Sequence, residues 1–262
     1  MTQRPQSRHR DTQSVQSSLF FVPFLIASLL IVHSPLYSQP FIEVGFGGNA
    51  VIPAADFGGT PNEFLSGTKY GVRAGGGIHL VSRFSFADLP LRASINYAIL
   101  RNSGAAATGT LELTQKIFSI SLQPEYFFST DRSALRAYVG GIIELNNFGG
   151  DATFTGVPGI PNNLYVITSA ERLGFGAAAG LLIPLNERIT LDLALSFHIM
   201  NPVGKLWEEA ITLPQRLNSY LRLNDAADPQ YAASDPDHFI GSPRKIRTLQ
   251  FTVSFLFAYS EL

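Results

Sequence analysis

The sequence contains no cysteine and little charge, since only 15% of its 262 residues are charged. The absence of cysteine excludes disulfides, thiolate metal ligands, a cysteine nucleophile and the lipid-modified cysteine of a bacterial lipoprotein. A formal net charge of -1 gives no basic field that could hold nucleic acid, so no nucleic-acid partner is expected. Phosphate-loop, zinc-protease and dinucleotide-binding motifs are also missing. Glycine, at 23, and phenylalanine, at 20, are abundant, which suits a sheet facing lipid but also an ordinary β-sandwich.

Only one long apolar run occurs, and it lies close to the N-terminus. The run extends from Leu19 to Val32 and is about 14 residues long, shorter than the roughly 20 residues that a spanning helix needs. Small and polar residues follow the run, and three arginines precede it: Arg4, Arg8 and Arg10. This pattern predicts a secretory signal peptide over residues 1–38, cleaved after Ser38, and an exported outer-membrane β-barrel domain over residues 39–262. The alternative is an uncleaved helical anchor.

Eight segments beyond the signal peptide alternate apolar and polar side chains with a period of two, as half-buried strands do. The clearest segment runs from Ile189 to Met200. The predicted strands cover residues 41–51, 69–83, 91–101, 111–128, 135–146, 172–183, 189–200 and 246–259. Most reach the roughly 9–11 residues of a tilted transmembrane strand and exceed the about 5–6 residues of an average globular strand. The alternation is poor before Lys116, which indicates a bulge or a bend there.

The links between these segments alternate in length. Those after the second, fourth and sixth segments are short, whereas the others are longer and the last two are the longest. Short periplasmic turns and long extracellular loops are typical of transmembrane barrels. We therefore predict an all-β fold, an antiparallel up-and-down transmembrane β-barrel of about eight strands in the bacterial cell outer membrane. Its long extracellular loops 3 and 4 would cover residues 147–170 and 202–245. Loop 4 could cap the barrel, form a partner surface or pack against loop 3.

One face of the predicted strands is consistently apolar, and the other carries charge. A charge that faces lipid at the midplane costs roughly 2–4 kcal/mol, so the charged face must line the interior. Small residues on that face, such as Gly174 and Gly180, leave room for long side chains in a narrow barrel. The apolar face of the second segment includes Tyr70 and Val72. We expect a packed lumen with a polar network built from Glu43, Arg73, Arg92, Glu125, Arg136, Glu144 and Asp192.

Three stretches of these strands resemble a known family. They are SISLQPEYFF (Ser119–Phe128), RAYVGGIIE (Arg136–Glu144) and GFGAAAGLLIPLNERITLDLALSF (Gly174–Phe197). The chain from about residue 40 onward resembles the outer-membrane protein β-barrel domain family, porin-like barrels of Bacteroidetes and their Chlorobi-side relatives, and is similar in size to the OmpA-type transmembrane domain. The resemblance implies an eight-stranded barrel without shared catalytic residues. The chain departs from OmpA in that no peptidoglycan-binding domain is expected after the last strand.

The remaining polar residues give weak signals for chemistry. Ser196, His198 and Asp192 share one face of a strand and could form a hydrolase triad, but they should point inward, away from lipid. A second cluster, Asp225, Asp228, Asp235, Asp237 and His238, lacks the spacing of a calcium-binding EF-hand loop. We therefore predict no catalytic, cofactor-binding or metal-binding residues and no cofactor.

These patterns together predict a protein that is not an enzyme and that has a structural or surface-interaction role through its long loops. A narrow channel or transporter for small or hydrophobic solutes is the alternative. A lipid-modifying barrel enzyme and a soluble periplasmic β-protein that binds a small apolar ligand rank behind it. The expected partners are outer-membrane lipid and, during biogenesis, the barrel assembly machinery, and the expected state is a monomer.

Overall fold

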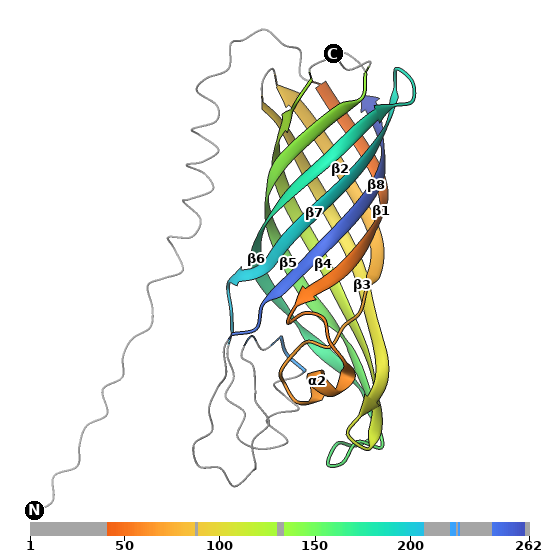
Figure 1. Cartoon of the computed structure of the whole chain (residues 1–262), viewed down its shortest axis with the longest axis vertical. Helices are drawn as coiled ribbons and strands as arrows, with labels where there is room; N and C mark the ends of the chain where they lie inside the picture. The colour runs from red at the N-terminus through yellow and green to blue at the C-terminus, as the bar shows by residue number, and fades with distance from the viewer. Residues whose placement is uncertain are drawn as a thin grey trace, which may run out of the picture. The chain divides into compact units, whose positions relative to one another are not determined.

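The computed structural model describes residues 41–86, 89–129, 134–206, 221–223, 225 and 243–259. Eight antiparallel strands form a closed barrel in which each strand pairs with the next and β8 pairs with β1 (Figure 1). The strands are β1 (Phe41–Ala55), β2 (Gly75–Phe86), β3 (Leu89–Ala106), β4 (Gly109–Phe127), β5 (Arg136–Thr155), β6 (Asn163–Pro184), β7 (Ile189–Val203) and β8 (Ile246–Tyr259), and helix α2 (Pro61–Leu65) lies between β1 and β2. The predicted all-β, up-and-down barrel is confirmed. The predicted signal peptide, residues 1–38, lies outside the described residues.

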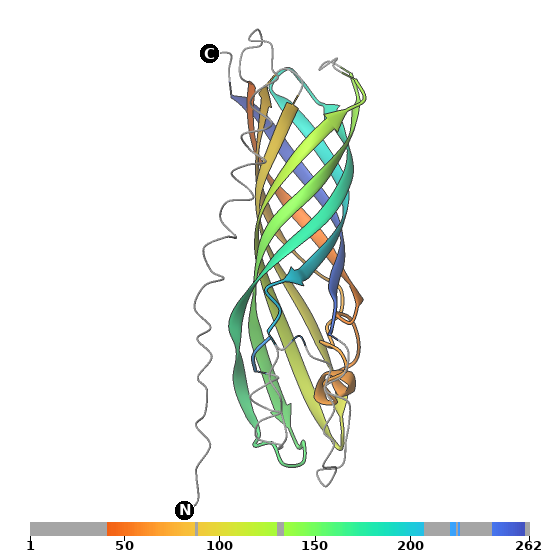
Figure 2. The same ribbon diagram turned by 90° about the vertical axis from the view of Figure 1, so that its left-hand side faces the viewer.

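The connections between strands lie at two ends of the barrel. The start of β1 and the end of β8 lie side by side, at the end where β2 joins β3, β4 joins β5 and β6 joins β7. We call this the turn end, and we call the opposite end, which includes α2, the loop end. At the loop end, β3 to β6 continue past β2 and β7 and project as a curved sheet (Figure 2).

The projecting sheet replaces one of the predicted loops. Residues 147–170 were expected to form long loop 3, but β5 continues to Thr155 and β6 begins at Asn163. The prediction is wrong because apolar side chains of this segment, those of Phe148, Ala152 and Phe154, are fully buried and hold the hairpin against the interior. Most of predicted loop 4 lies outside the described residues, but its described residues 221–223 contact β6 through the Thr168–Arg222 bridge.

The apolar and polar faces exchange sides along β4. Near the loop end, Leu111 and Leu113 are buried while Glu112 between them is exposed, whereas near the turn end Phe118 is exposed and Ser119 is buried. Pairing between β3 and β4 nevertheless keeps one register from end to end, so of the bulge or bend predicted before Lys116 the bulge is wrong, and the bend stays a prediction. Near the turn end the outer face of β4 meets lipid, so its outward side chains are apolar. Near the loop end the outer face meets water, so the apolar side chains lie on the inner face instead, and the alternation in the sequence is irregular where the two parts join.

An apolar cluster fills the interior at the loop end. It joins strand residues such as Leu100, Leu113 and Met200 to residues of the β1–β2 connection: Phe57, Phe64, Tyr70 and Val72. The prediction that Tyr70 and Val72 face lipid is wrong, since they are 2% and 1% exposed and precede the first residue of β2. Their apolar side chains instead enter the barrel mouth, where burial removes them from water.

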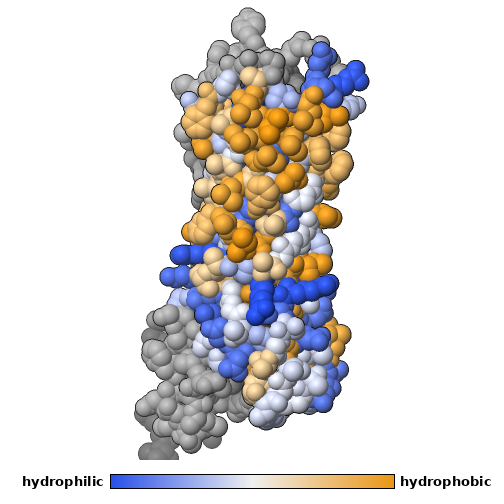
Figure 3. All heavy atoms as spheres, turned by 45° about the vertical axis from the view of Figure 1, so that its right-hand side comes forward, coloured by the Kyte–Doolittle hydropathy of each residue, from blue (hydrophilic) through white to orange (hydrophobic). Residues whose placement is uncertain are grey.

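The outer surface nearer the turn end is an apolar band. Every strand exposes large apolar side chains there, for example Phe46, Leu80, Ile95, Leu122, Ile143, Phe175, Leu195 and Phe251. Figure 3 shows the band giving way to a hydrophilic surface toward the loop end. A continuous apolar belt around a closed barrel whose charges point inward is the arrangement of a transmembrane barrel. In the described part of the chain, no helix has the length and apolar character required to span a membrane.

Candidate functional site

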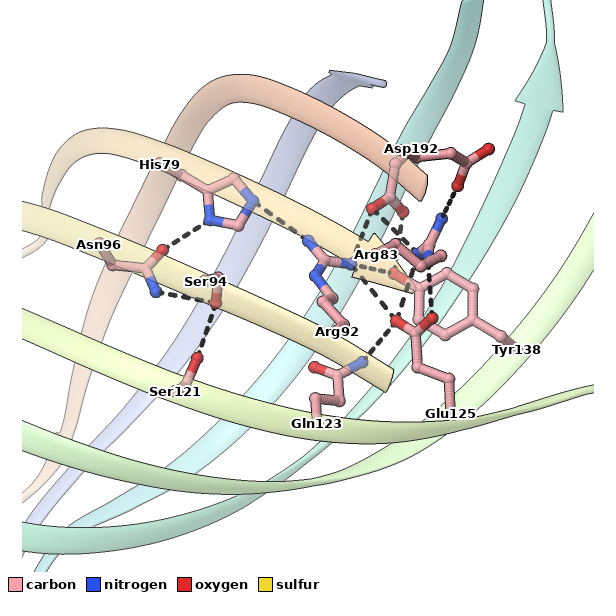
Figure 4. A network of polar contacts seen from close by, with 11 residues as sticks. His79, Arg83, Arg92, Ser94, Asn96, Ser121, Gln123, Glu125, Tyr138 and Asp192 are labelled. Carbon is pink, nitrogen blue, oxygen red and sulfur yellow. Dashed lines mark hydrogen bonds and ion pairs between the residues drawn. The ribbon is translucent and has the colours of Figure 1, made fainter. Parts of the chain in front are cut away.

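Two buried arginines organise the polar lumen beneath the apolar band. Arg83 makes a two-point ion pair with Glu125, from Nε to Oε2 at 2.7 Å and from Nη2 to Oε1 at 3.2 Å, and its Nη1 lies 3.3 Å from Glu43 Oε2 (Figure 4). Arg92 Nη1 donates to Asp192 Oδ2 at 2.7 Å. All five side chains are at most 5% exposed. An unpaired charge that is buried in this way destabilises the fold strongly, so each arginine needs its carboxylate partner in the folded barrel.

Neutral side chains extend this network along the lumen. Tyr138 Oη accepts from Arg92 and donates to Asp192 Oδ1 at 2.8 Å. Arg92 also donates to His79 Nε2 at 3.1 Å, and His79 Nδ1 lies 2.7 Å from Asn96 Oδ1. Since arginine has no acceptor, Nε2 of His79 must be the unprotonated nitrogen, and Nδ1–H then donates to Asn96. The imidazole is therefore fixed in one neutral tautomer.

The sequence-predicted lumen residues divide into several groups. Glu43, Arg92, Glu125 and Asp192 lie together in the arginine network. Arg136 lies at the turn end, with its guanidinium 5.0 Å from the Phe127 ring centroid. Glu144 belongs to a separate group, described below.

Arg73 must be removed from the predicted lumen set. It is exposed and precedes β2, which begins at Gly75. Arg73 is an even number of residues from inward-facing positions of β2, which is why it was predicted to point inward. Alternation of side chains holds only within a strand, and Arg73 lies before β2 begins. Three buried arginines of the described residues were not predicted: Arg83, which has the inward phase of β2, Arg172, which was placed at the border of a strand, and Arg244, which was placed in loop 4. The alternation of side chains along β2 places Arg83 on the same inward face as His79, so the sequence pattern could have identified it.

A serine, a histidine and a glutamate are hydrogen-bonded in a row across β7 and β5. Ser196 Oγ lies 2.8 Å from His198 Nε2, and His198 Nδ1 lies 2.9 Å from Glu144 Oε2. The acid is thus Glu144 rather than Asp192, which was considered for a triad from the sequence and which pairs with Arg92 instead. The connectivity is that of a hydrolytic triad. However, all three side chains are buried in the lumen, with Ser196 8% exposed.

One apolar cluster lies at the loop end of the polar lumen, and a second is interleaved with the charged residues nearer the turn end. The loop-end cluster includes Ile117, Phe148 and Ile246. At the turn end, a second cluster consists of Val81, Tyr138, Leu182, Ala194 and Leu256, with Phe127 packed against it. Buried bulky groups therefore surround the polar lumen in which Ser196 lies.

A buried carboxylate, Asp225, ties the connection after β7 to the barrel mouth. Asp225 is 0% exposed and accepts from Arg172 Nε and Nη2 at 2.9 and 2.7 Å. Asn201 Nδ2 and Tyr70 Oη also donate to its Oδ1, at 2.5 and 3.3 Å. The side chain thus joins β6, β7 and the β1–β2 connection. The four other members of the predicted acidic cluster, Asp228, Asp235, Asp237 and His238, lie outside the described residues.

The projecting sheet has an open edge along the first part of β6. Strand β7 begins to pair with β6 only at Leu173, so residues 163–171 have no strand partner on that side within the described ranges. One contact occurs there, from the Thr168 N–H to the Leu221 carbonyl at 2.6 Å, with a parallel bridge to Arg222. On the outer face of this edge, Leu164 and Val166 are 58% and 69% exposed. Their neighbours on β5 are Thr153 and Asp151.

Among the described residues, no group of histidine, aspartate and glutamate side chains could hold a metal ion. The chain matches no protein-family model. It also matches no curated protein.

Several solved structures are similar in fold. Neisserial surface protein A has 14% identity and a TM-score of 0.45, with 85% of this chain and 98% of that chain covered. Ail, the attachment invasion locus protein of Yersinia pestis, in complex with a heparin analogue, has 12% identity and a TM-score of 0.42, with coverages of 85% and 100%. A major outer membrane protein of Thermus thermophilus has 13% identity and a TM-score of 0.43, with coverages of 82% and 99%. At such values, these likenesses establish nothing about activity or partners.

Proposed function

We propose that the protein is a closed outer-membrane β-barrel that acts through surface interactions at its loop end. The observation that carries this proposal is the division of the barrel into two parts. Around the turn end, an apolar band encloses a lumen filled by paired charges such as Arg83 and Glu125. At the loop end, β3 to β6 project with a polar outer face, which includes Glu112 and Thr155.

The filled lumen argues against a channel or a transporter. Arg83 and Tyr138 are each 1% exposed, and an apolar cluster fills the interior at the loop end. Solute passage would require the buried ion pairs to open, and breaking one such pair costs about 3–5 kcal/mol. A lipid-modifying activity is disfavoured by the same burial, because Ser196 lies inside the barrel rather than on its lipid-facing surface.

The absence of cysteine allows a direct test of orientation. A single Thr155→Cys substitution places a thiol at the tip of the β5–β6 hairpin, and a Glu187→Cys substitution places one in the exposed β6–β7 turn. On intact Gram-negative cells that express each variant, a membrane-impermeant maleimide should label the first and leave the second unlabelled until the cells are lysed. Labelling of Glu187→Cys instead of Thr155→Cys would refute the proposed surface role of the loop end.

Planar-bilayer recordings test the closed lumen. Purified refolded protein should give no stepwise ion current. Reproducible single-channel currents that change in the Arg83→Met variant would favour the channel alternative. Hydrolysis of phospholipid or lipid A acyl esters that disappears in Ser196→Ala would instead favour an enzyme.

A further inference from the structure

We propose that outward-facing cations at the loop-end border of the apolar band bind the phosphate group of a membrane lipid. These cations are Arg73, Arg101 and Lys116, and we call them the cationic border. The inference rests on the proposed function, because a loop end outside the cell places the cationic border in the outer leaflet. The ligand is then the phosphate-bearing lipid of that leaflet.

The cationic border begins where the apolar band ends. On β3 the next outward residue after Ile99 is Arg101, and on β4 the next after Phe118, which is 41% exposed, is Lys116. Figure 3 shows strongly hydrophilic side chains where the band ends. Two residues of a strand tilted by about 40° advance about 5 Å along the barrel axis, and the headgroup layer is about 5–8 Å thick on each side of a bilayer. The cations therefore lie at the level of lipid headgroups.

Strand pairing places two of these cations close together. Ile99 pairs with Lys116 and Arg101 pairs with Thr114, so Arg101 and Lys116 occupy diagonal positions on neighbouring strands. Residues in such positions are about 7–8 Å apart, which allows two long side chains to converge on one group. A phosphate group accepts charge-assisted hydrogen bonds from both a guanidinium and an ammonium group.

The segment before β2 adds Arg73 to this pair. Asn102 Nδ2 donates to the Gly71 carbonyl at 2.7 Å, and pairing between β2 and β3 begins at Gly75. Arg73 lies between these two attachment points, so it lies against the part of β3 that carries Arg101. Its side chain is exposed. Three cations from consecutive parts of the wall thus face the same region of lipid headgroups.

The arginines of the cationic border are available to a ligand. Within the described ranges, neither Arg73 nor Arg101 makes a hydrogen bond or an ion pair with its side chain. Lys116 Nζ donates to Asp151 Oδ2 at 2.7 Å, but the two side chains are 43% and 30% exposed. An exposed pair of this kind is weak, so Lys116 can exchange the carboxylate for a phosphate. Glu112 lies further from the band on β4.

The charge at the border is confined to one side of the barrel. On β5 and β6 the first outward residues beyond the band are Asn147 and Glu171, which pair with each other. On β8 the corresponding residue is Arg247, which follows Leu249. Positive charge therefore extends from β8 to β4 and is replaced by an amide and a carboxylate on β5 and β6. Cations that only extend into water have no need of such an asymmetry, whereas a bound anionic lipid requires it.

Lipid binding by the purified full chain, refolded in dodecyl maltoside micelles, tests the proposal. The probe is lipid A, and native mass spectrometry counts the molecules that remain bound. Dephosphorylated lipid A, which keeps the acyl chains, is the control and should not remain bound; equal binding of the two lipids would overturn the proposal. Inorganic phosphate in excess should displace little lipid A, because it lacks acyl chains. Complete displacement would assign the site to free phosphate and overturn the lipid assignment.

Charge substitutions locate the site. Arg101→Gln should weaken lipid A binding about fivefold and Arg73→Gln/Arg101→Gln about twentyfold, whereas Arg188→Gln, in the exposed turn at the opposite end, should change it by less than about twofold. Asp151→Asn removes the carboxylate that competes for Lys116 and should strengthen binding, a gain that a folding defect cannot produce. Unchanged binding by the double variant overturns the proposal. Heat-modifiable gel migration establishes that the variants are folded.

Maleimide labelling at Thr155→Cys on intact cells separates this inference from the proposed function. Surface labelling without selective binding of lipid A removes only the lipid site. Absence of surface labelling would place the cationic border in the inner leaflet, and it would remove both the proposed function and the assignment of an outer-leaflet lipid, whatever binds in micelles.

Discussion

Arg83 and Glu125, 42 positions apart in the sequence, meet inside the barrel in a two-point ion pair with a shortest distance of 2.7 Å. Glu125 is further held by Gln123 Nε2, at 3.0 Å, and Arg83 also approaches Glu43 and Asp192. The pair therefore links β2 to β4 across the lumen and belongs to a network whose members depend on one another.

Removing the guanidinium should destabilise the barrel strongly. Arg83→Met removes the ion-pair partner of buried Glu43 and leaves Glu125 with only Arg92, 3.7 Å away, so we expect a loss of about 3–5 kcal/mol in the free energy of unfolding. Urea unfolding in vesicles measures this loss. The matched control is Arg188→Met, which removes the same group from an exposed turn and should cost less than about 0.5 kcal/mol. Equal effects of the two substitutions would contradict the structural importance of the network.

Gly180 should tolerate no side chain. A Cβ at this position would lie closer than 3.0 Å to the Cζ, Oη and Cε1 atoms of Tyr138, whose hydroxyl bonds both Arg92 and Asp192. The ring cannot yield without breaking these bonds, so Gly180→Ala should destabilise the barrel by about 1–3 kcal/mol. A Cβ at Gly141 would meet nothing within 4 Å, which makes Gly141→Ala the control. Unfolding free energies in vesicles that do not differ between the two variants would disprove this role of Gly180.

The alternation of side chains was enough to predict the barrel, its strand number and most of its inward acidic and basic residues. It failed where the surroundings change. Tyr70 and Val72 are buried in the barrel mouth, and Arg73 lies before β2. In the hairpin from residue 147 to residue 170, which lies in water, the apolar side chains are on the inner face rather than the outer one. Period-two patterns identify two faces but do not say which one meets lipid.

The partners of the lumen residues could not be predicted either. Strand register sets which side chains meet across the barrel, and several candidates of the right charge were available for each arginine. Asp192 and Glu144 illustrate the point, since the first pairs with Arg92 and the second with His198. Only the three-dimensional structure distinguishes the two carboxylates.

Asp225 should control the attachment of the connection after β7. Asp225→Ala removes the acceptor of Arg172 Nε and Nη2 and of Asn201 Nδ2, so local opening should become easier. We expect trypsin to cleave at Lys205 or Arg222 at least about tenfold faster, which corresponds to about 1.4 kcal/mol of local stability. Asp151→Ala, which breaks an exposed pair with Lys116, is the control and should leave cleavage unchanged. No acceleration in Asp225→Ala would show that other contacts hold the connection.

The capping box of α2, formed by Thr60 and Glu63, should make the stability of this part of the loop end fall at acid pH. The pKa of Glu63 is lowered, first by the hydrogen bond from Lys69 and then by the Thr60 backbone N–H, while the carboxylate is largely exposed. A carboxyl with a lowered pKa stabilises the folded loop fully above its ordinary pKa, and the stabilisation is lost as pH falls through the lowered value. The protection factor of the Thr60 amide, which is the exchange rate of an unstructured peptide at the same pH divided by that of this amide, should therefore fall only at acid pH. Lys69→Met should raise the pKa of Glu63 in a carboxyl NMR titration, whereas Lys116→Met should not, and a titration unchanged by Lys69→Met would refute the assigned cause.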